Sequence, residues 1–488
     1  MNSTISLPKK DYVLILFLAI VYLLIRAPFL EYLPLVQDEA PYSVVISEMA
    51  DSPGLTPTFF GYPVSWKPPL FHITYSLFSN LPLSIEMAFR LPSLIFGLLS
   101  LVPLFYLLQN AGSSRNIAFF TSLIFLFSFV SHYPQTALLA DSLAFLLIVT
   151  SLFLYTEKKH GSWKFLAAGI LVFAAFFVKS VLALMVPLLA VVYFLNQKNV
   201  LKNPVFIISL IAAPLALVLH FMLLDSVGLA EELYFTEMKF HLSGKGGFLE
   251  GIYQIVGSIS TLLIGAGFWL ALSFIGFWKR WRENKFMTAW YLLTGLAILG
   301  GHFMPWYFLP VFPAIAYFSS LTLIKHNGRE RIDTFFAIFL VLTIIATIIP
   351  PLMWYEHLHS FKSAEKEVGL MISGKENVLI IGGYRPGVVA YKVLTEKRSG
   401  GESDFGWILD PSDKLSDEVI MEYIDDYQLD EYDVIDGRFS SMFLNHDVAY
   451  RKDTNISNFD YIVLLNRGIL LDGELIYNNS GISVYHNS

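Results

Sequence analysis

Long apolar segments dominate the first 356 residues of this chain of 488 residues. Eleven can be delimited, and each has roughly the 17–25 residues that a membrane-crossing helix needs. They lie near 11–30, 89–110, 115–131, 136–156, 163–179, 180–197, 203–224, 251–278, 286–302, 305–324 and 332–354. A charged content of only 15% agrees with this pattern. The sequence therefore predicts a polytopic α-helical membrane protein with about 11 transmembrane helices.

The basic residues between these segments are sorted by side. With a cytoplasmic N-terminus, fifteen of the twenty-one Lys and Arg residues in 1–356 fall in inner loops. Because cytoplasmic enrichment of Lys and Arg sets orientation, we predict a multi-pass protein of the cell membrane whose N-terminus is cytoplasmic. Six cations fall on or near the outer side instead: Arg26, Lys67, Arg90, Lys179, Lys239 and Lys245. An anionic ligand on the outer side is the simplest reason for them.

Residues 357–488 differ from the apolar part in charge. They carry 12 basic and 22 acidic side chains, a net charge of −10, whereas residues 1–356 have a net charge of +3. An odd number of spans places this tail outside the cell, as a C-terminal extracytoplasmic α/β domain. We expect strands and a helix in the tail. The strands are expected at 376–383, 459–466, 474–478 and 482–486, and the helix at 415–429.

Composition excludes several functions. An acidic domain repels phosphate, so we expect no nucleic-acid partner. The chain has no cysteine, which excludes disulfides, thiol catalysis and Cys-ligated zinc. No internal repeat is visible, which weakens the interpretation as an inverted-repeat transporter.

The sequence thus predicts two domains. The first is a transmembrane domain, 1–356, with two long outer loops at 31–88 and 225–250, and the second is the extracytoplasmic domain, 357–488.

The first outer loop opens with an acidic pair, Asp38 and Glu39. Carboxylates at a membrane boundary are costly unless they are used or satisfied. One interpretation is a helix start, with Asp38 as the N-cap, Glu39 in the first turn and Pro41 tolerated there. That interpretation is compatible with catalysis, because a capped helix holds Asp38 rigidly.

Further polar residues follow at intervals. Lys67 precedes two prolines, which restrict its backbone and preorganise its ammonium group for a phosphate. Asp141 is followed by a run of uncharged residues, so it must face the helical bundle or a polar cavity. Arg90 begins the second span, and Lys179 stands at an outer turn. Each of these could instead snorkel or pair internally.

This ordered set of motifs resembles certain GT-C membrane glycosyltransferases. The 4-amino-4-deoxy-arabinose transferases and protein O-mannosyltransferases are the most similar group. Their Tyr-Leu-Leu-Pro element is similar to the segment Trp306–Pro313 here, and the resemblance covers about 11–325. It implies a GT-C fold for the membrane domain.

The resemblance also implies roles for individual residues. Asp38 matches the acidic residue beside the acceptor and the departing sugar, with Glu39 as its neighbour, and Lys67 matches the lysine that binds the donor phosphate. In the second outer loop this chain lacks the family's usual arginine. The remaining candidates are Arg90, Lys239, His241 and Lys245 for the phosphate, and Asp141, Lys179 and Tyr307 as polar residues of the cavity.

The expected reaction follows from these roles. A polyprenyl-monophosphate sugar would donate its sugar to a lipid, glycan or protein acceptor on the outer face, with inversion at the anomeric carbon. The donor would enter from the surrounding membrane lipids. No cofactor is required, although a divalent metal near Asp38 or Glu39 is compatible with the chemistry.

Two other classes remain open. A secondary transporter would also bury Asp141 and Lys179, but should show broken helices and halves related by a repeat. A membrane assembly scaffold would use the acidic tail for partners and need none of the outer cations.

Overall fold

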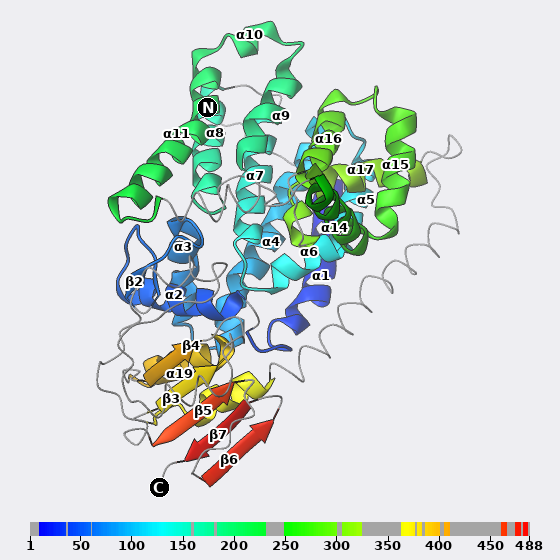
Figure 1. Ribbon diagram of the computed structural model, residues 1–488. Helices are drawn as coiled ribbons and strands as arrows, with labels where there is room; N and C mark the ends of the chain where they lie inside the picture. The colour runs from blue at the N-terminus through cyan, green and yellow to red at the C-terminus, as the bar shows by residue number, and fades with distance from the viewer. Residues whose placement is uncertain are drawn as a thin grey trace. The chain divides into compact units, whose positions relative to one another are not determined.

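The computed structural model divides the chain into two compact units, each built from discontinuous segments (Figure 1). The first unit comprises Met1–Leu30, Lys67–Thr74 and Arg90–Met353. The second comprises Glu31–Trp66, Tyr75–Phe89 and Trp354–Ser488. The structure describes residues 9–35, 38–59, 61–157, 161–179, 183–230, 248–299, 305–324, 363–375, 378–382, 386–400, 405–409, 460–465, 474–479 and 482–486.

Helices make up the first unit. They are α1 (Lys9–Arg26), η1 (Ala27–Phe29), α5 (Arg115–Leu126), α6 (Phe129–Thr136), α7 (Asp141–Thr156), α8 (Ser162–Phe176), α9 (Met185–Phe194), α10 (Lys198–Leu201), α11 (Pro204–Ser226), α14 (Phe248–Ala266), α15 (Phe268–Arg280), α16 (Lys285–Leu299), η4 (Pro305–Phe308) and α17 (Phe312–Ile324). Two further helices have residues in both units, α3 (Pro69–Ser79) and α4 (Ile85–Asn110).

Three helices in the described residues are long and apolar enough to cross a membrane. They are Lys10–Phe29, Ile85–Asn110 and Pro204–Ser226, and the number rises to five if each of two bent pairs is one span. Several shorter apolar helices, such as α7 and α8, occupy other predicted spans. The count of eleven spans and the orientation of the termini stay predictions, and the predicted span 332–354 lies outside the described residues.

Two predicted spans are bent rather than straight. The predicted span 115–131 covers α5 and only the start of α6, which meet at a 62° bend, and 251–278 covers most of α14 and α15, which meet at a 102° bend. At the first break, the Ser128 side chain caps α6 by accepting from the Ser131 N–H at 3.3 Å. At the second, Gly267 has φ +54°, a conformation that residues with a Cβ rarely adopt. The bends were not predicted, because hydropathy does not report backbone direction.

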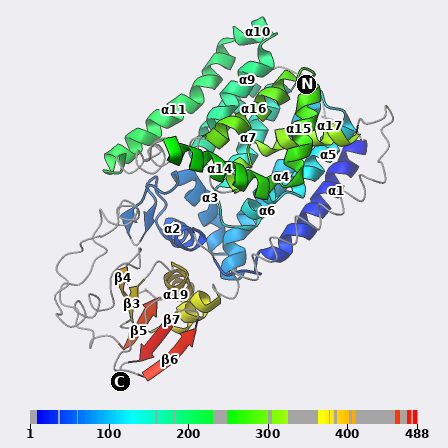
Figure 2. The ribbon, with the colours of Figure 1, turned by 45° about the vertical axis from the view of Figure 1, so that its right-hand side comes forward.

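Small residues bring the helices of the first unit together. A Cβ on Gly169 of α8 would lie 2.9 Å from the Cα of Ser209 on α11. A Cβ on Gly276 of α15 would lie 2.1 Å from the carbonyl oxygen of Phe318 on α17. Such close approach is typical of membrane helices, where dispersion rather than the hydrophobic effect drives helix association. The helix α8 also packs against α7 (Figures 1 and 2).

The second unit combines part of the first outer loop with the tail. The loop contributes α2 (Glu39–Asp51) and a small hairpin of β1 (Thr58–Phe59) and β2 (Tyr62–Pro63). The tail contributes a helical segment at 363–371 and α19 (Pro386–Arg398), which packs against α2.

A five-stranded sheet completes this unit, with the order β4-β3-β5-β7-β6 (Figure 2). Its strands are β3 (Val378–Gly382), β4 (Phe405–Leu409), β5 (Tyr461–Leu465), β6 (Glu474–Asn479) and β7 (Ile482–His486). The strand β3, second in this order, pairs in parallel with β4 and β5, and α19 forms the crossover between β3 and β4. The remaining pairs are antiparallel.

The strands predicted in the tail are confirmed. β3, β5, β6 and β7 lie within or close to the predicted ranges, and β6 and β7 form the expected hairpin. The predicted helix at 415–429 lies outside the described residues. The helix α19 was missed, although Pro386 at its first position and Lys397 and Arg398 in its last turn are ordinary helix boundary signals.

Candidate functional site

The acidic pair lies at the start of α2, in the second unit. Asp38 occupies the N-cap position, and its carbonyl accepts from the Tyr42 N–H at 3.1 Å. Within the described residues, its side chain makes no capping hydrogen bond. The Asp38 side chain is exposed, whereas Glu39 is buried with 1% of its surface accessible. The two carboxylates therefore have different environments, and Asp38 is the one that can reach a ligand.

Lys67 lies in the first unit, just before α3. The Leu70 N–H, near the start of that helix, donates to the Phe177 carbonyl at 3.0 Å, which fixes this segment against the end of α8. Lys67 is half-buried. Burial, together with the nearby Lys67 charge, lowers the pKa of His72 to about 3. The histidine on this helix is therefore neutral at physiological pH, and the charge beside it belongs to Lys67.

Three of the predicted cavity residues come together in the first unit. Lys179 Nζ lies 2.5 Å from Asp141 Oδ1 and 4.4 Å from the centre of the Tyr307 ring. Lys179 lies in the turn after α8, Asp141 is the first residue of α7, and Tyr307 belongs to η4. Asp141 is 3% exposed and Lys179 is 15% exposed. Lys179 therefore makes a largely buried ion pair with Asp141 and a cation–π contact with Tyr307, two residues far from it in sequence.

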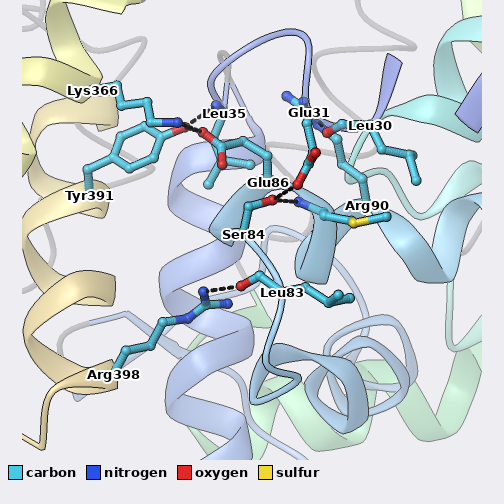
Figure 3. Close-up of polar contacts among 11 residues, drawn as sticks. Leu30, Glu31, Leu35, Leu83, Ser84, Glu86, Arg90, Lys366, Tyr391 and Arg398 are labelled. Carbon is cyan, nitrogen blue, oxygen red and sulfur yellow. Dashed lines mark hydrogen bonds and ion pairs between the residues drawn. The ribbon is translucent and has the colours of Figure 1, made fainter. Parts of the chain in front are cut away.

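Two of the outer cations bind carbonyl groups where helices end. Arg90 Nη1 donates to the Leu30 carbonyl at 3.0 Å (Figure 3). Arg26 Nη2 donates to the Leu126 carbonyl at 3.0 Å, at the break between α5 and α6. Such carbonyls lack an intrahelical donor. The positions of Arg26 and Arg90 are thus explained in part by these structural hydrogen bonds, without an anionic ligand.

A buried polar surface on α6 was not predicted. Ser131 accepts from Arg26 Nη2 at 2.9 Å, and the His132 ring lies 5.0 Å from that of Phe29. Gln135 is fully buried, and among the described residues its amide has no hydrogen-bond partner. The signal was present in the sequence, because polar residues inside an apolar run are rare in membrane helices.

The remaining candidates cannot be placed. Lys239, His241 and Lys245 lie outside the described residues. Within the described part of the chain, no group of three or more His, Asp or Glu residues could hold a metal ion.

The first unit is therefore a bundle of apolar helices, several of them short or broken, with charged residues at helix ends. Residues 66–223 match a family model described as dolichyl-phosphate-mannose-protein mannosyltransferase. No match was found among curated protein sequences.

Solved structures with a similar fold are glycosyltransferases. Apo ArnT from Cupriavidus metallidurans superposes with a TM-score of 0.60 at 14% identity, covering 97% of both chains. The same enzyme bound to undecaprenyl phosphate gives a TM-score of 0.61 at 13% identity. The archaeal oligosaccharyltransferase AglB from Archaeoglobus fulgidus, in complex with an inhibitory peptide and a dolichol-phosphate, gives 0.50 at 10% identity, over 93% of this chain and 69% of that one.

The chain thus has the fold of a GT-C membrane protein. The resemblance to the glycosyltransferases of the aminoarabinose transferase and protein O-mannosyltransferase group is confirmed, by sequence over 66–223 and by fold over nearly the whole chain. Broken helices, which we expected of a transporter, are present here too. Broken helices therefore do not distinguish a secondary transporter from a membrane glycosyltransferase.

Proposed function

We propose that this protein is a membrane glycosyltransferase that moves a sugar from a polyprenyl monophosphate to an acceptor on the outer face of the membrane. The observation that carries the proposal is the extent of the fold match, which covers 97% of this chain and of ArnT. The family match over 66–223 supports it, because that segment contains Lys67, Arg90, Asp141 and Lys179.

The donor would be held through its phosphate. One of the two ArnT structures contains undecaprenyl phosphate, and Lys67 is a half-buried cation on a segment restricted by two prolines. When the sugar leaves, the phosphate gains negative charge, and a preorganised cation stabilises that charge more in the transition state than in the ground state. Lys179 is a weaker candidate, because Asp141 already compensates its charge.

The acceptor would be activated by a carboxylate. Its hydroxyl must lose a proton as it attacks the anomeric carbon, and Asp38 is the exposed carboxylate at the first turn of α2. A single displacement with the proton passing to Asp38 forms the new glycosidic bond, breaks the bond to the phosphate oxygen and inverts the anomeric centre. The buried Glu39 is less suited to this task.

A divalent metal is not needed for this scheme. AglB has been crystallised in complex with Zn and sulfate. The described residues of this chain offer no cluster of three metal-ligating side chains, so we derive no step through a metal.

The catalytic base is tested with Asp38→Asn on purified protein and polyprenyl-phosphate sugars. Loss of a general base should lower kcat by about 10²–10⁴ while donor binding persists. Asp225→Asn is the control, because Asp225 is an exposed aspartate at the end of α11 with no part in the proposed site. Near-normal turnover in Asp38→Asn would exclude this role.

The phosphate site is tested with Lys67→Ala. This change should raise KM for the donor and lower kcat, and Lys67→Arg should restore activity only in part, because a planar guanidinium does not replace a point charge. Lys198→Ala, which removes an exposed lysine of α10, should leave both parameters unchanged. Unchanged donor kinetics in Lys67→Ala would exclude the role of Lys67.

A further inference from the structure

A hydroxyl of the tail contacts the first outer loop just before Asp38. The Leu35 N–H donates to the Tyr391 hydroxyl at 2.8 Å, and the hydroxyl in turn donates to Glu86 Oε1 at 2.6 Å (Figure 3). Leu35 is three residues before Asp38 and 356 residues before Tyr391. All of these groups belong to the second unit.

Each partner in this network is buried. Leu35 is 1%, Glu86 is 2% and Tyr391 is 0% exposed. The Glu86 charge is compensated by Lys366, whose Nζ lies 2.6 Å from the same carboxylate oxygen (Figure 3). A buried polar network whose members are all bonded holds its groups more rigidly than exposed hydrogen bonds do.

The chemistry of the bridge requires a hydroxyl. The Leu35 N–H needs an acceptor, and the Glu86 carboxylate needs a donor. A phenol supplies both from one oxygen, whereas phenylalanine would fill the same space and supply neither. Removing the hydroxyl would leave a buried N–H and a buried carboxylate each short of one partner.

Tyr391 belongs to α19, and this helix also contacts α2 after Asp38. Lys397 donates to the Ser47 carbonyl and forms an ion pair with Asp51, near the end of α2. Arg398 Nη1 donates to the Leu83 carbonyl at 2.7 Å, in the turn before α4. The helix α19 therefore contacts the chain both before and after Asp38.

We propose that Tyr391 is a positioning residue for Asp38. Through this residue, the tail contributes to the transfer reaction. This inference rests on the proposed function, since it assumes that Asp38 accepts the acceptor proton. The hydroxyl fixes the Leu35 backbone to Glu86, and α2 thereby presents its first turn in one conformation. A shift of about 1 Å in a catalytic group can lower a rate on the order of 10²-fold.

The variant Tyr391→Phe tests the proposal. We expect kcat to fall by about 10- to 100-fold while KM for the polyprenyl-phosphate sugar stays within about twofold, because the phosphate role belongs to Lys67. Tyr477→Phe is the matched control, since the Tyr477 hydroxyl also donates to a carboxylate, that of Glu367, at 2.8 Å, but in a solvent-exposed hydrogen bond. It should leave both parameters unchanged.

Two further measurements separate positioning from general destabilisation. In the Asp38→Asn background, Tyr391→Phe should cause no additional loss of transfer, because both changes act on one group. Glu86→Gln keeps an acceptor for the phenol and should be milder than Tyr391→Phe. Independent losses in the double variant, or an unchanged kcat in Tyr391→Phe, would overturn the proposal.

Hydrogen exchange provides a readout that does not depend on activity. The amide of Leu35 should exchange faster in Tyr391→Phe than in the wild type and in Tyr477→Phe. Unchanged exchange would show that the bridge is absent and would also overturn the proposal. If the wild type transfers no sugar although the exchange difference is found, the proposed function fails, and the positioning role fails with it for that separate reason.

Discussion

At the scale of single residues, the ion pair of Lys179 and Asp141 has the largest predicted effect on stability. Neither side chain is more than 15% exposed. Removing one partner leaves an uncompensated charge, which costs about 3–5 kcal/mol in buried pairs. Lys179→Met should therefore lower the thermal midpoint in detergent, and the double variant Lys179→Met/Asp141→Leu should regain most of the loss.

A matched control for the ion pair lies on the same unit. Arg280 and Glu283 form a pair at 2.8 Å in which Glu283 is 50% exposed. Exposed pairs contribute about 0–1 kcal/mol, so Glu283→Gln should hardly change the midpoint. A double variant at Lys179 and Asp141 that is stable but inactive would instead assign these residues to substrate binding.

His72 should make stability dependent on pH. The α3 helix lies between the first two predicted spans, and burial, with the charge of Lys67, lowers the pKa of His72 to about 3 from 6.5. Between these values the unfolded state binds a proton that the folded state does not, so stability falls as pH drops below about 6.5. Thermal midpoints from pH 7 to 4.5 should decline less steeply for His72→Phe, and equal slopes would contradict this.

At the scale of elements, the break at Gly267 depends on one backbone conformation. A Cβ at this position would meet no atom within 4 Å, so any cost of substitution comes from φ +54° and not from a clash. Gly267→Ala should destabilise the protein by about 1–3 kcal/mol, the range for a strained backbone. The thermal midpoint of purified protein measures this.

The control for this change is Gly54→Ala. A Cβ on Gly54 would have its nearest neighbours at 3.9 Å, and its φ is not in the positive range. Little change is expected there. Equal midpoints for Gly267→Ala and the wild type would show that α14 and α15 do not depend on this glycine.

Local pattern predicted some elements well and others poorly. The strand β5 and the β6–β7 hairpin followed from apolar runs beside turn residues, because strand formation there is encoded locally. The break at Gly267 was missed although Gly265 and Gly267 interrupt the apolar run. An apolar run reports burial, whereas the direction of a helix depends on one φ angle.

At the scale of the whole molecule, the sequence located charged groups but not their partners. Asp38 was singled out from its position after the first predicted span and Lys67 from the two prolines that follow it, and their roles stay predictions. The contact between Lys179 and Asp141, and the bridge from Leu35 to Tyr391, join residues far apart in sequence. No local pattern specifies such pairs, because they form only when the elements pack.

Topology can be tested independently of chemistry. The chain has no cysteine, so an introduced cysteine is labelled without background. Ser399→Cys, at an exposed position after α19, should react with an impermeant reagent in intact cells, and Ser162→Cys should not. Labelling at position 162 alone would invert the orientation and remove the outer active site.

The discontinuity of the second unit has a consequence for biosynthesis. The loop segments that carry Asp38 leave the ribosome early, but their partners begin only at Trp354. At about 5–20 residues per second, roughly 15–60 s separate the two. A chain interrupted in that interval could insert its spans and still lack the helix that brackets Asp38. Under the proposed function, such incomplete chains would be present in the membrane but inactive, because the segment made last completes the unit that contains Asp38.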